Sequence, residues 1–169
     1  MQTRIFLIGF MGSGKSTLGS QLARAIGYRF VDMDHMIEET AEMTIPGIFK
    51  EHGEEVFRKW ERDILRELCS QEQVVVSTGG GAPCHADMID IMNGCGDTVY
   101  IRLPVLVLLE RLRHSKTQRP LIQGKSEEEL KEFISSLLEE REHFYNRARF
   151  IVDGMGLNPD TLAGMLNAT

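Results

Sequence analysis

The sequence predicts an α/β fold with three layers, in which a central five-stranded parallel sheet lies between helices. Short apolar, β-favouring runs alternate along the chain with longer segments whose apolar residues recur at helical spacing. This alternation is typical of a parallel sheet with right-handed crossovers. With 169 residues, 42% of them hydrophobic and 26% charged, the chain has the length and composition of one globular domain. We therefore expect residues 1–169 to form a single domain.

The first predicted strand and helix flank a glycine-rich turn. Residues 5–8 are continuously apolar, and apolar residues recur at helical spacing from 18 to 26. Between them, residues 9–17 read GFMGSGKST and satisfy the pattern G-x-x-x-x-G-K-[ST]. A helix that begins after such a turn has unpaired N–H groups and a dipole directed at the loop. The stretch therefore predicts a phosphate-binding loop and a P-loop NTPase fold.

Each polar residue of this loop has an expected task on a nucleoside triphosphate. The ammonium of Lys15 suits the transferable phosphates, and the Ser16 hydroxyl suits the Mg²⁺ ion that bridges them. An ordinary glycine turn that caps a helix is the structural alternative. The nucleotide contacts are expected from Gly12, Ser13, Gly14, Lys15, Ser16 and Thr17.

The second predicted strand, residues 28–32, ends in two aspartates spaced i and i+2. One carboxylate, Asp32, can hold Mg²⁺ through water, and the other, Asp34, can accept a proton from an attacking hydroxyl. Helix capping is the alternative role, because Asp is a common N-cap residue.

Residues 33–62 read as a helical hairpin that we expect to bind the substrate. Pro46 and Gly53 interrupt the helical pattern, and a long amphipathic helix then runs to about residue 70. Arg58 lies on the apolar-rich side of this helix. Neighbouring charges at i+3 and i+4 also suit an ordinary ion-paired surface, and spacing alone does not decide between a functional role for Arg58 and a surface ion pair.

The third predicted strand, residues 74–76, runs into three consecutive glycines. Gly79, Gly80 and Gly81 leave backbone N–H groups open to a ligand, although a flexible linker also has this composition. A helix opened by Pro83, a strand over 98–103 and a helix over 104–114 are expected next.

Residues 115–125, SKTQRPLIQGK, have no clear period and read as a lid over the site. Arg119 in this lid is placed like an arginine finger, which would meet charge developing between phosphate donor and acceptor. Ser126 and Glu129 form a capping box for a helix over 127–145. Arg141 lies among glutamates on that helix, where an ordinary surface ion pair is the alternative role. A fifth strand over 150–152 and a closing helix from 158–159 complete the pattern.

Charge and composition exclude several classes of function. A net charge of −6 disfavours a nucleic-acid or anionic-membrane surface, and no apolar run is long enough to span a membrane. The first ten residues do not read as a signal peptide, so we expect a cytoplasmic protein. The three cysteines, Cys69, Cys84 and Cys95, have no C-x-x-C spacing and are expected to be packing residues rather than disulfides or zinc ligands.

These motifs together resemble the shikimate kinase family over nearly the whole chain. The resemblance rests on GFMGSGKST, on VDMDHMIE at 31–38, on GEEVFRKWE at 53–61, on VVSTGGG, on QRPL at 118–121 and on REHFYNRA. It implies transfer of the γ-phosphoryl group of ATP to the 3-hydroxyl of shikimate, which gives shikimate 3-phosphate and ADP in aromatic amino-acid biosynthesis. A gluconate kinase and a non-catalytic nucleotide-binding switch are the rival hypotheses.

The resemblance also assigns roles that spacing left open. It implies that Arg58 and Arg141 bind the shikimate carboxylate and that Arg119 binds phosphate. It places Asp34 and the glycines Gly79, Gly80 and Gly81 on the shikimate hydroxyls. Either Arg111 or Arg113 takes the position that stacks on adenine. We expect ATP and Mg²⁺ as cofactors, shikimate as the small-molecule partner, and a monomer.

Overall fold

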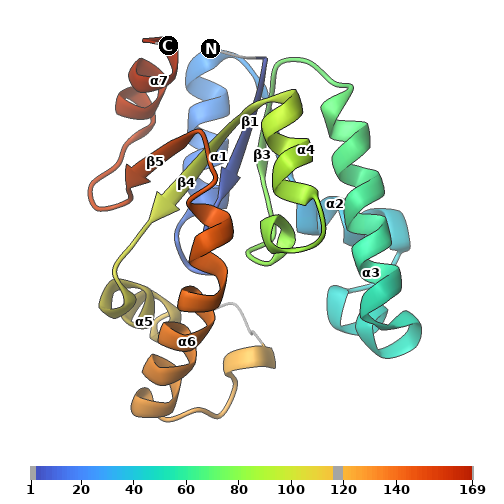
Figure 1. The fold of residues 1–169 in the computed structure, drawn as a ribbon, viewed down its shortest axis with the longest axis vertical. Coiled ribbons are helices and arrows are strands. Elements are labelled where there is room, and N and C mark those ends of the chain that lie inside the picture. Colours follow the sequence, from blue (N-terminus) through green and yellow to red (C-terminus); the bar gives the residue numbers. More distant parts are fainter. Residues whose placement is uncertain (1–2, 116–119, 169) are drawn as a thin grey trace.

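The computed structural model describes residues 3–115 and 120–168, and they form a five-stranded parallel sheet with helices on both faces (Figure 1). The strands are β1 (Arg4–Ile8), β2 (Arg29–Asp32), β3 (Val74–Ser77), β4 (Asp97–Arg102) and β5 (Phe150–Asp153). The helices are α1 (Lys15–Ile26), α2 (Met33–Ala41), α3 (Ile45–Cys69), α4 (Met88–Cys95), α5 (Val105–Arg113), α6 (Glu127–Tyr145) and α7 (Pro159–Asn167), with two short 3₁₀ helices, η1 (Ala82–Cys84) and η2 (Pro120–Ile122).

The sheet has the strand order β2-β3-β1-β4-β5, and every neighbouring pair is parallel. Strand β1 is central, with Leu7 in register with Ser77 of β3 and with Val99 of β4. On the far side of β3, Asp32 of β2 is also in register with Ser77. The carboxyl ends of β2, β3 and β1 therefore meet at one edge of the sheet, which is where ligands bind in open α/β folds.

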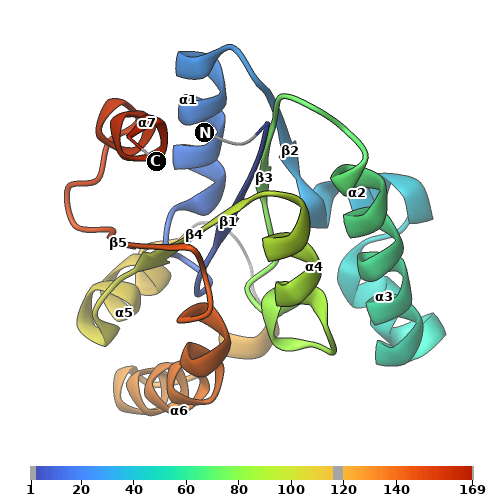
Figure 2. The same cartoon turned by 45° about the horizontal axis from the view of Figure 1, so that its top comes forward.

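Side chains of β1 alternate between two separate apolar cores, as the two-residue period of a strand requires. Phe6 and Ile8 are fully buried in the larger core with residues of α3, α4, α5 and α6. Ile5 and Leu7 are fully buried in the smaller core with residues of α1 and α7. Figure 2 shows α1 and α7 beside each other on one face and α3, α4 and α6 on the other. The predicted three-layer α/β/α arrangement is confirmed.

Helix α3 is interrupted where the sequence predicted a break. Gly53 has φ 80° and ψ 171°, values outside the helical region, and α3 changes direction there. The first part of α3 begins at an N-cap, Thr44, whose side chain accepts a hydrogen bond from the backbone N–H of Gly47. Together with α2 these segments form the predicted helical hairpin, which stands at one end of the sheet (Figure 1).

The helix expected to run on from Pro83 is instead two elements. Pro83 lies in the short helix η1, and α4 begins only at Met88. Between them Ala86 has φ 48°, a left-handed conformation that a continuous α-helix cannot contain. The capping box at Ser126 is confirmed, with its side chain accepting from the N–H of Glu129 and its own N–H donating to the Glu129 carboxylate.

The expectation that all three cysteines are packing residues is wrong for two of them. Cys69 at the end of α3 and Cys95 at the end of α4 form a disulfide, with Cα atoms 5.6 Å apart, and Cys84 is free. The two cysteines are 26 residues apart in the chain, and their pairing depends on where the ends of two helices lie in space. Spacing along the chain could therefore not reveal it. Among the described residues, no helix has the length and apolar character needed to cross a membrane.

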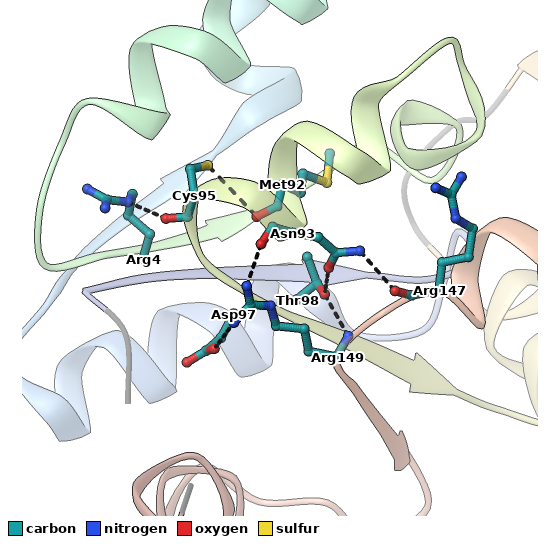
Figure 3. Close-up of polar contacts among 8 residues, drawn as sticks. All are labelled: Arg4, Met92, Asn93, Cys95, Asp97, Thr98, Arg147 and Arg149. Carbon is teal, nitrogen blue, oxygen red and sulfur yellow. Dashed lines mark hydrogen bonds and ion pairs between the residues drawn. The ribbon is translucent and has the colours of Figure 1, made fainter.

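Polar contacts hold the turn that follows α4 against the rest of the sheet (Figure 3). Arg4 donates from Nε to the carbonyl oxygen of Cys95 at 2.5 Å. The Thr98 hydroxyl donates to the Asn93 side chain at 2.5 Å and accepts from the backbone N–H of Arg149 at 2.8 Å. The disulfide and these contacts lie near the amino-terminal ends of the strands, away from the edge where β1, β2 and β3 end.

Candidate active site

A cavity of about 560 Å³ opens at the carboxyl ends of β1, β2 and β3. The structure thus brings together three stretches that the sequence singled out one by one as candidates for ligand binding, namely the glycine-rich loop, the two aspartates and the glycine run. The lining residues are Met11, Gly12, Gly14, Lys15, Ser16, Thr17, Asp32, Asp34, Ser77, Thr78, Gly79, Gly80, Arg111 and Ser115.

The loop between β1 and α1 has the form of an anion site. Gly14, the residue before α1, has φ 93°, a left-handed conformation that favours glycine. No side chain caps the start of α1, so its first N–H groups and its dipole are directed at the cavity. This is the arrangement in which helix N-termini bind phosphate groups.

Lys15 lies buried beneath this loop. Its ammonium donates to the carbonyl oxygens of Gly9 at 2.8 Å and Phe10 at 2.9 Å, and it lies 3.4 Å from the Ser13 hydroxyl. The side chain therefore folds back along the loop whose backbone surrounds the phosphate position, and its positive charge lies at the floor of the cavity.

Three side-chain oxygens meet beside Lys15. The Ser16 hydroxyl donates to Asp32 at 2.6 Å and lies 3.1 Å from the Ser77 hydroxyl. Asp32 also accepts from the backbone N–H of His35 at 3.3 Å, so it is both a helix cap and a member of this cluster. Ser77 was not predicted. Its register with Asp32 and Leu7 places it here, and register cannot be read from one strand's sequence.

This cluster fits a magnesium ion. Mg²⁺ prefers oxygen ligands and is commonly held by one or two protein oxygens together with substrate phosphates, rather than by a cage of protein ligands. Ser16 and Asp32 supply such oxygens next to the phosphate loop. Residues 3–115 and 120–168 contain no group of three or more His, Cys, Asp or Glu side chains arranged to hold a metal on their own.

Asp34, in the first turn of α2, faces the glycine run. A Cβ atom added to Gly79 would lie only 2.7 Å from Oδ1 of Asp34, so the close approach requires glycine there. Burial raises the pKa of Asp34 above its ordinary value, as does the neighbouring Asp32 carboxylate, while Lys15 acts in the opposite direction. A carboxylate whose pKa is raised in a cavity is suited to accept a proton.

Two arginines from separate helices converge on Gly81. A Cβ atom added to Gly81 would lie 3.4 Å from a guanidinium nitrogen of Arg58 on α3 and 3.4 Å from one of Arg141 on α6. Two guanidinium groups at one place form a strong site for a carboxylate, because each can donate two parallel hydrogen bonds. From local spacing alone, an ordinary surface ion pair was the alternative role for each of these arginines.

Glu61 holds Arg58 in this position. Its side chain is 1% exposed, and it accepts a hydrogen bond from Nη1 of Arg58 at 2.8 Å. Burial raises the pKa of Glu61, whereas the Arg58 charge lowers it. Arg58 is also 3.3 Å from the more exposed Glu54. Sequence reasoning treated Glu61 as part of an ordinary charged helix surface, because burial of a charge on a helix is decided by tertiary packing.

The structure separates the two arginines between which the sequence could not choose. Arg111 donates to the backbone carbonyl of Ser13 at 3.1 Å and lines the main cavity. It also lines an adjoining cavity of about 260 Å³, together with Gly154 and Leu157 from the segment after β5. Arg113 instead forms a 2.8 Å ion pair with Glu127 on α6. Arg111 is therefore the arginine that lies against the phosphate loop.

Arg119, expected to act from the lid, lies outside the residues that the structure describes, and its role stays a prediction. Of the predicted lid, Ser115 lines the main cavity and Pro120–Ile122 form the helix η2.

Comparison with known proteins points to one family. The family profile described as shikimate kinase matches residues 11–166. A shikimate kinase of Phocaeicola vulgatus is 50% identical over 88% of this chain and 85% of its own length. The solved shikimate kinase of Bacteroides thetaiotaomicron superposes with a TM-score of 0.88 at 46% identity, covering 91% of this chain and 88% of that one. The shikimate kinase of Acinetobacter baumannii, solved with shikimate, gives 0.87 at 34% identity, covering 100% and 96%.

Proposed function

The chain belongs to the shikimate kinase family, and from that premise we propose how its residues carry out the ATP-dependent phosphorylation of shikimate. The observation that carries the assignment of roles is the convergence of Arg58 and Arg141 on Gly81, the residue after Gly80, which lines the cavity of the phosphate loop. It gives a carboxylate site beside a phosphate site, which is what a kinase acting on a hydroxylated acid requires.

The phosphate loop holds the donor. The N–H groups at the start of α1 and the Lys15 ammonium bind the phosphates of ATP, and Ser13, Gly14 and Thr17 line the path to the second cavity. Arg111 lies at that second cavity and faces the adenine side. Arg119 closes over the phosphates from the lid in this proposal, as an arginine finger does.

The arginines and glycines hold the acceptor. Arg58 and Arg141 bind the shikimate carboxylate, and Gly79 to Gly81 present backbone groups to its ring hydroxyls. With the acid fixed there, the 3-hydroxyl is directed toward Asp34 and the phosphate loop. This orientation turns a reaction between two solutes into one between two bound groups.

Asp34 takes the proton in the transfer. The 3-hydroxyl oxygen forms a bond to the γ-phosphorus while the bond from that phosphorus to the β,γ-bridging oxygen breaks. ADP leaves with the electron pair, and the hydroxyl proton passes to the Asp34 carboxylate. The raised pKa of Asp34 favours this step, because burial disfavours the charged carboxylate and the side chain therefore holds a proton more readily.

Ser16 directly, and Asp32 through water, are the residues that would hold Mg²⁺. When bound, the ion supplies positive charge that offsets the negative charge of the phosphates. The single domain, the monomer and the cytoplasmic location are part of the same proposal, supported by the chain's length and by the bacterial relatives.

An assay of ADP release tests the function. Purified protein with ATP and Mg²⁺ is expected to release ADP when shikimate is added, and to lose that activity when the Mg²⁺ is chelated. Gluconate serves as the comparison acceptor, since it presents a carboxylate and hydroxyls without the ring. A protein that binds ATP but releases no ADP with either acceptor would refute the proposal, and a preference for gluconate would refute the acceptor.

A further inference from the structure

Tyr145, the last residue of α6, lies in the core with its hydroxyl directed at the acceptor side of the site. Its ring is fully buried, and its hydroxyl donates a 2.6 Å hydrogen bond to the backbone carbonyl of Gly80, 65 residues away in the chain. The ring lies 5.0 Å from that of Tyr100 on β4, which fixes its direction. A core tyrosine thus contacts the middle glycine of the substrate segment, and its hydroxyl also interacts with the side chain of Arg141.

The same face of α6 carries Arg141. Residues four apart on a helix lie one above the other, so Arg141 and Tyr145 face the glycine segment together. A Cβ atom added to Gly80 would lie 3.4 Å from Nη1 of Arg141, and 3.4 Å from the Met11 backbone nitrogen in the phosphate loop. Gly80 is therefore packed between the phosphate loop and the arginine predicted to bind the carboxylate.

The hydrogen bond to the Gly80 carbonyl also sets the direction of the next N–H group. A trans peptide is planar, so the carbonyl of Gly80 and the N–H of Gly81 point in opposite directions. With the carbonyl held by Tyr145, the Gly81 N–H is fixed on the side away from the core. Gly81 is half-buried, and no residue among those the structure describes accepts a hydrogen bond from its N–H.

We propose that Tyr145 is a positioning residue for the acceptor, which holds the Gly80 to Gly81 peptide in the orientation that shikimate requires and keeps it in register with Arg141. The inference rests on the proposed function, because it assigns the glycine segment to the acceptor. It predicts a defect confined to shikimate: the phosphate loop is held by its own contacts with Lys15, so ATP binding does not depend on the phenol.

Tyr145→Phe tests the proposal, since it removes only the hydroxyl and leaves the ring in the core. We expect the KM and the Kd for shikimate to rise at least about threefold, as the loss of one hydrogen bond implies, with the KM for ATP changed by less than about twofold. Steady-state kinetics and calorimetric titration with shikimate provide the two measurements. Thermal unfolding of the variant is followed alongside.

Tyr100→Phe is the matched control. Tyr100 is 1% exposed and its ring packs against that of Tyr145, and the substitution likewise removes only a phenolic hydroxyl. The Tyr100 hydroxyl, however, interacts with Glu142 rather than with the glycine segment. It is expected to leave the KM for shikimate within about twofold of the wild-type value. A purely structural role for Tyr145 would lower the melting temperature or kcat without a selective change in shikimate binding.

The outcomes separate this inference from the proposed function. A shikimate KM in Tyr145→Phe that rises less than threefold, or an equal rise in Tyr100→Phe, overturns the positioning role while wild-type turnover of shikimate still stands. A wild-type protein that does not turn over shikimate at all rejects the proposed function first, and the inference with it.

Discussion

Asp32 and Asp34 are two residues apart and have different surroundings. Asp32 accepts hydrogen bonds from the Ser16 hydroxyl and from the N–H of His35, so both of its oxygens already have a hydrogen-bond donor. Asp34 lies against Gly79, where burial raises its pKa. Neighbouring carboxylates with separate environments can take separate roles, and the roles proposed for these two are metal binding and proton transfer.

Asp34→Asn is expected to separate activity from stability. The amide has the size of the carboxylate but accepts no proton, so we expect kcat to fall by roughly 100-fold or more. At pH 7 the free energy of unfolding should also be higher for the variant than for the wild type. Because the folded protein binds the Asp34 proton more tightly than the unfolded chain, the ionised side chain opposes folding above its raised pKa.

The pH dependence of that difference is the check. Denaturant unfolding of both proteins should show the stability gain of Asp34→Asn at neutral pH, and the gain should shrink as the pH falls to the ordinary value of 3.8 and wild-type Asp34 becomes protonated. A gain that grows on acidification would contradict the raised pKa. Undiminished kcat would remove Asp34 from the proton transfer.

Arg58→Lys is expected to weaken shikimate binding specifically. A lysine can keep a charge near Glu61 but cannot donate the paired hydrogen bonds of a guanidinium, so the KM for shikimate should rise at least about tenfold, or roughly 1.4 kcal/mol. The KM for ATP should change little. Arg62→Lys is the control, because Arg62 lies one turn later on α3 and pairs with Asp87. Equal KM values in the two variants would argue against the clamp.

Residues whose role follows from a local sequence pattern could be predicted from the sequence. Lys15 and Ser16 belong to a motif, and Gly79 to Gly81 follow a strand directly. Glu61 and Tyr145 stand in motifs that carry the resemblance but were given no role, and Ser77 was not singled out, because their roles depend on burial, a contact across 65 residues and strand register. For Arg58 and Arg141 the local pattern favoured an ordinary surface role, and only the family resemblance indicated a carboxylate site.

At the scale of elements, α3 links the acceptor site to the opposite end of the molecule. Arg58 lies near its middle, and its last residue, Cys69, is bonded to Cys95 at the end of α4. A salt bridge between Arg62 and Asp87 joins the same helix to the start of α4. Helix α3 is therefore fixed against α4 beyond the arginine, while its first part runs in another direction before Gly53 and buries Ile48 in the larger core.

Cys69→Ser is expected to lower the stability of the oxidised protein. A cross-link between residues 26 apart restricts the unfolded chain, and its loss should cost roughly 3.5 kcal/mol of unfolding free energy. Denaturant unfolding without reductant measures the loss, and with reductant the wild type and variant should coincide. Cys84→Ser is the control, because Cys84 carries no disulfide.

Thiol titration of the denatured, unreduced protein provides an independent count. It should find one reactive thiol before reduction and three after it. Three thiols before reduction would show that the pair is not bonded. In material alkylated at lysis, three free thiols would support the proposed cytoplasmic location, because reducing compartments keep thiols free, and one free thiol would contradict it.

Elements with strong local signals were predicted closely. The capping box at Ser126, the glycine turn before α1 and the break at Gly53 each stand where the sequence indicated. The segment from Pro83 to Met88 was predicted as continuous helix, because nothing in its composition marks Ala86 for a left-handed conformation.

At the scale of the whole molecule, two apolar cores share one sheet. Strand β1 places alternate residues in each core, so disrupting the packing of one core also disturbs the strand on which the other core is built. The sequence predicted the parallel sheet from its alternating elements. The order of the strands follows from which edges pair, and that is decided by contacts between residues far apart.

A single cooperative unfolding transition is therefore expected. Far-UV circular dichroism reports the whole fold, and the fluorescence of Trp60, the one tryptophan in the sequence, reports α3. Their thermal midpoints should coincide, and saturating shikimate should raise both together. A fluorescence midpoint below the circular dichroism midpoint would show that the helical hairpin unfolds separately. That result would contradict the proposal of a single domain.

The central place of β1 also has a consequence for synthesis on the ribosome. The strand that contains residues 4–8 pairs with β3, which begins only at Val74, and with β4, which begins only at Asp97. Until β3 is made both edges of an apolar strand lack their partners, and one edge stays open until β4 is made, which makes the growing chain prone to association with other chains. Since Arg141 is proposed to bind the acceptor, a chain released before it would carry the phosphate loop and lack part of the proposed shikimate site.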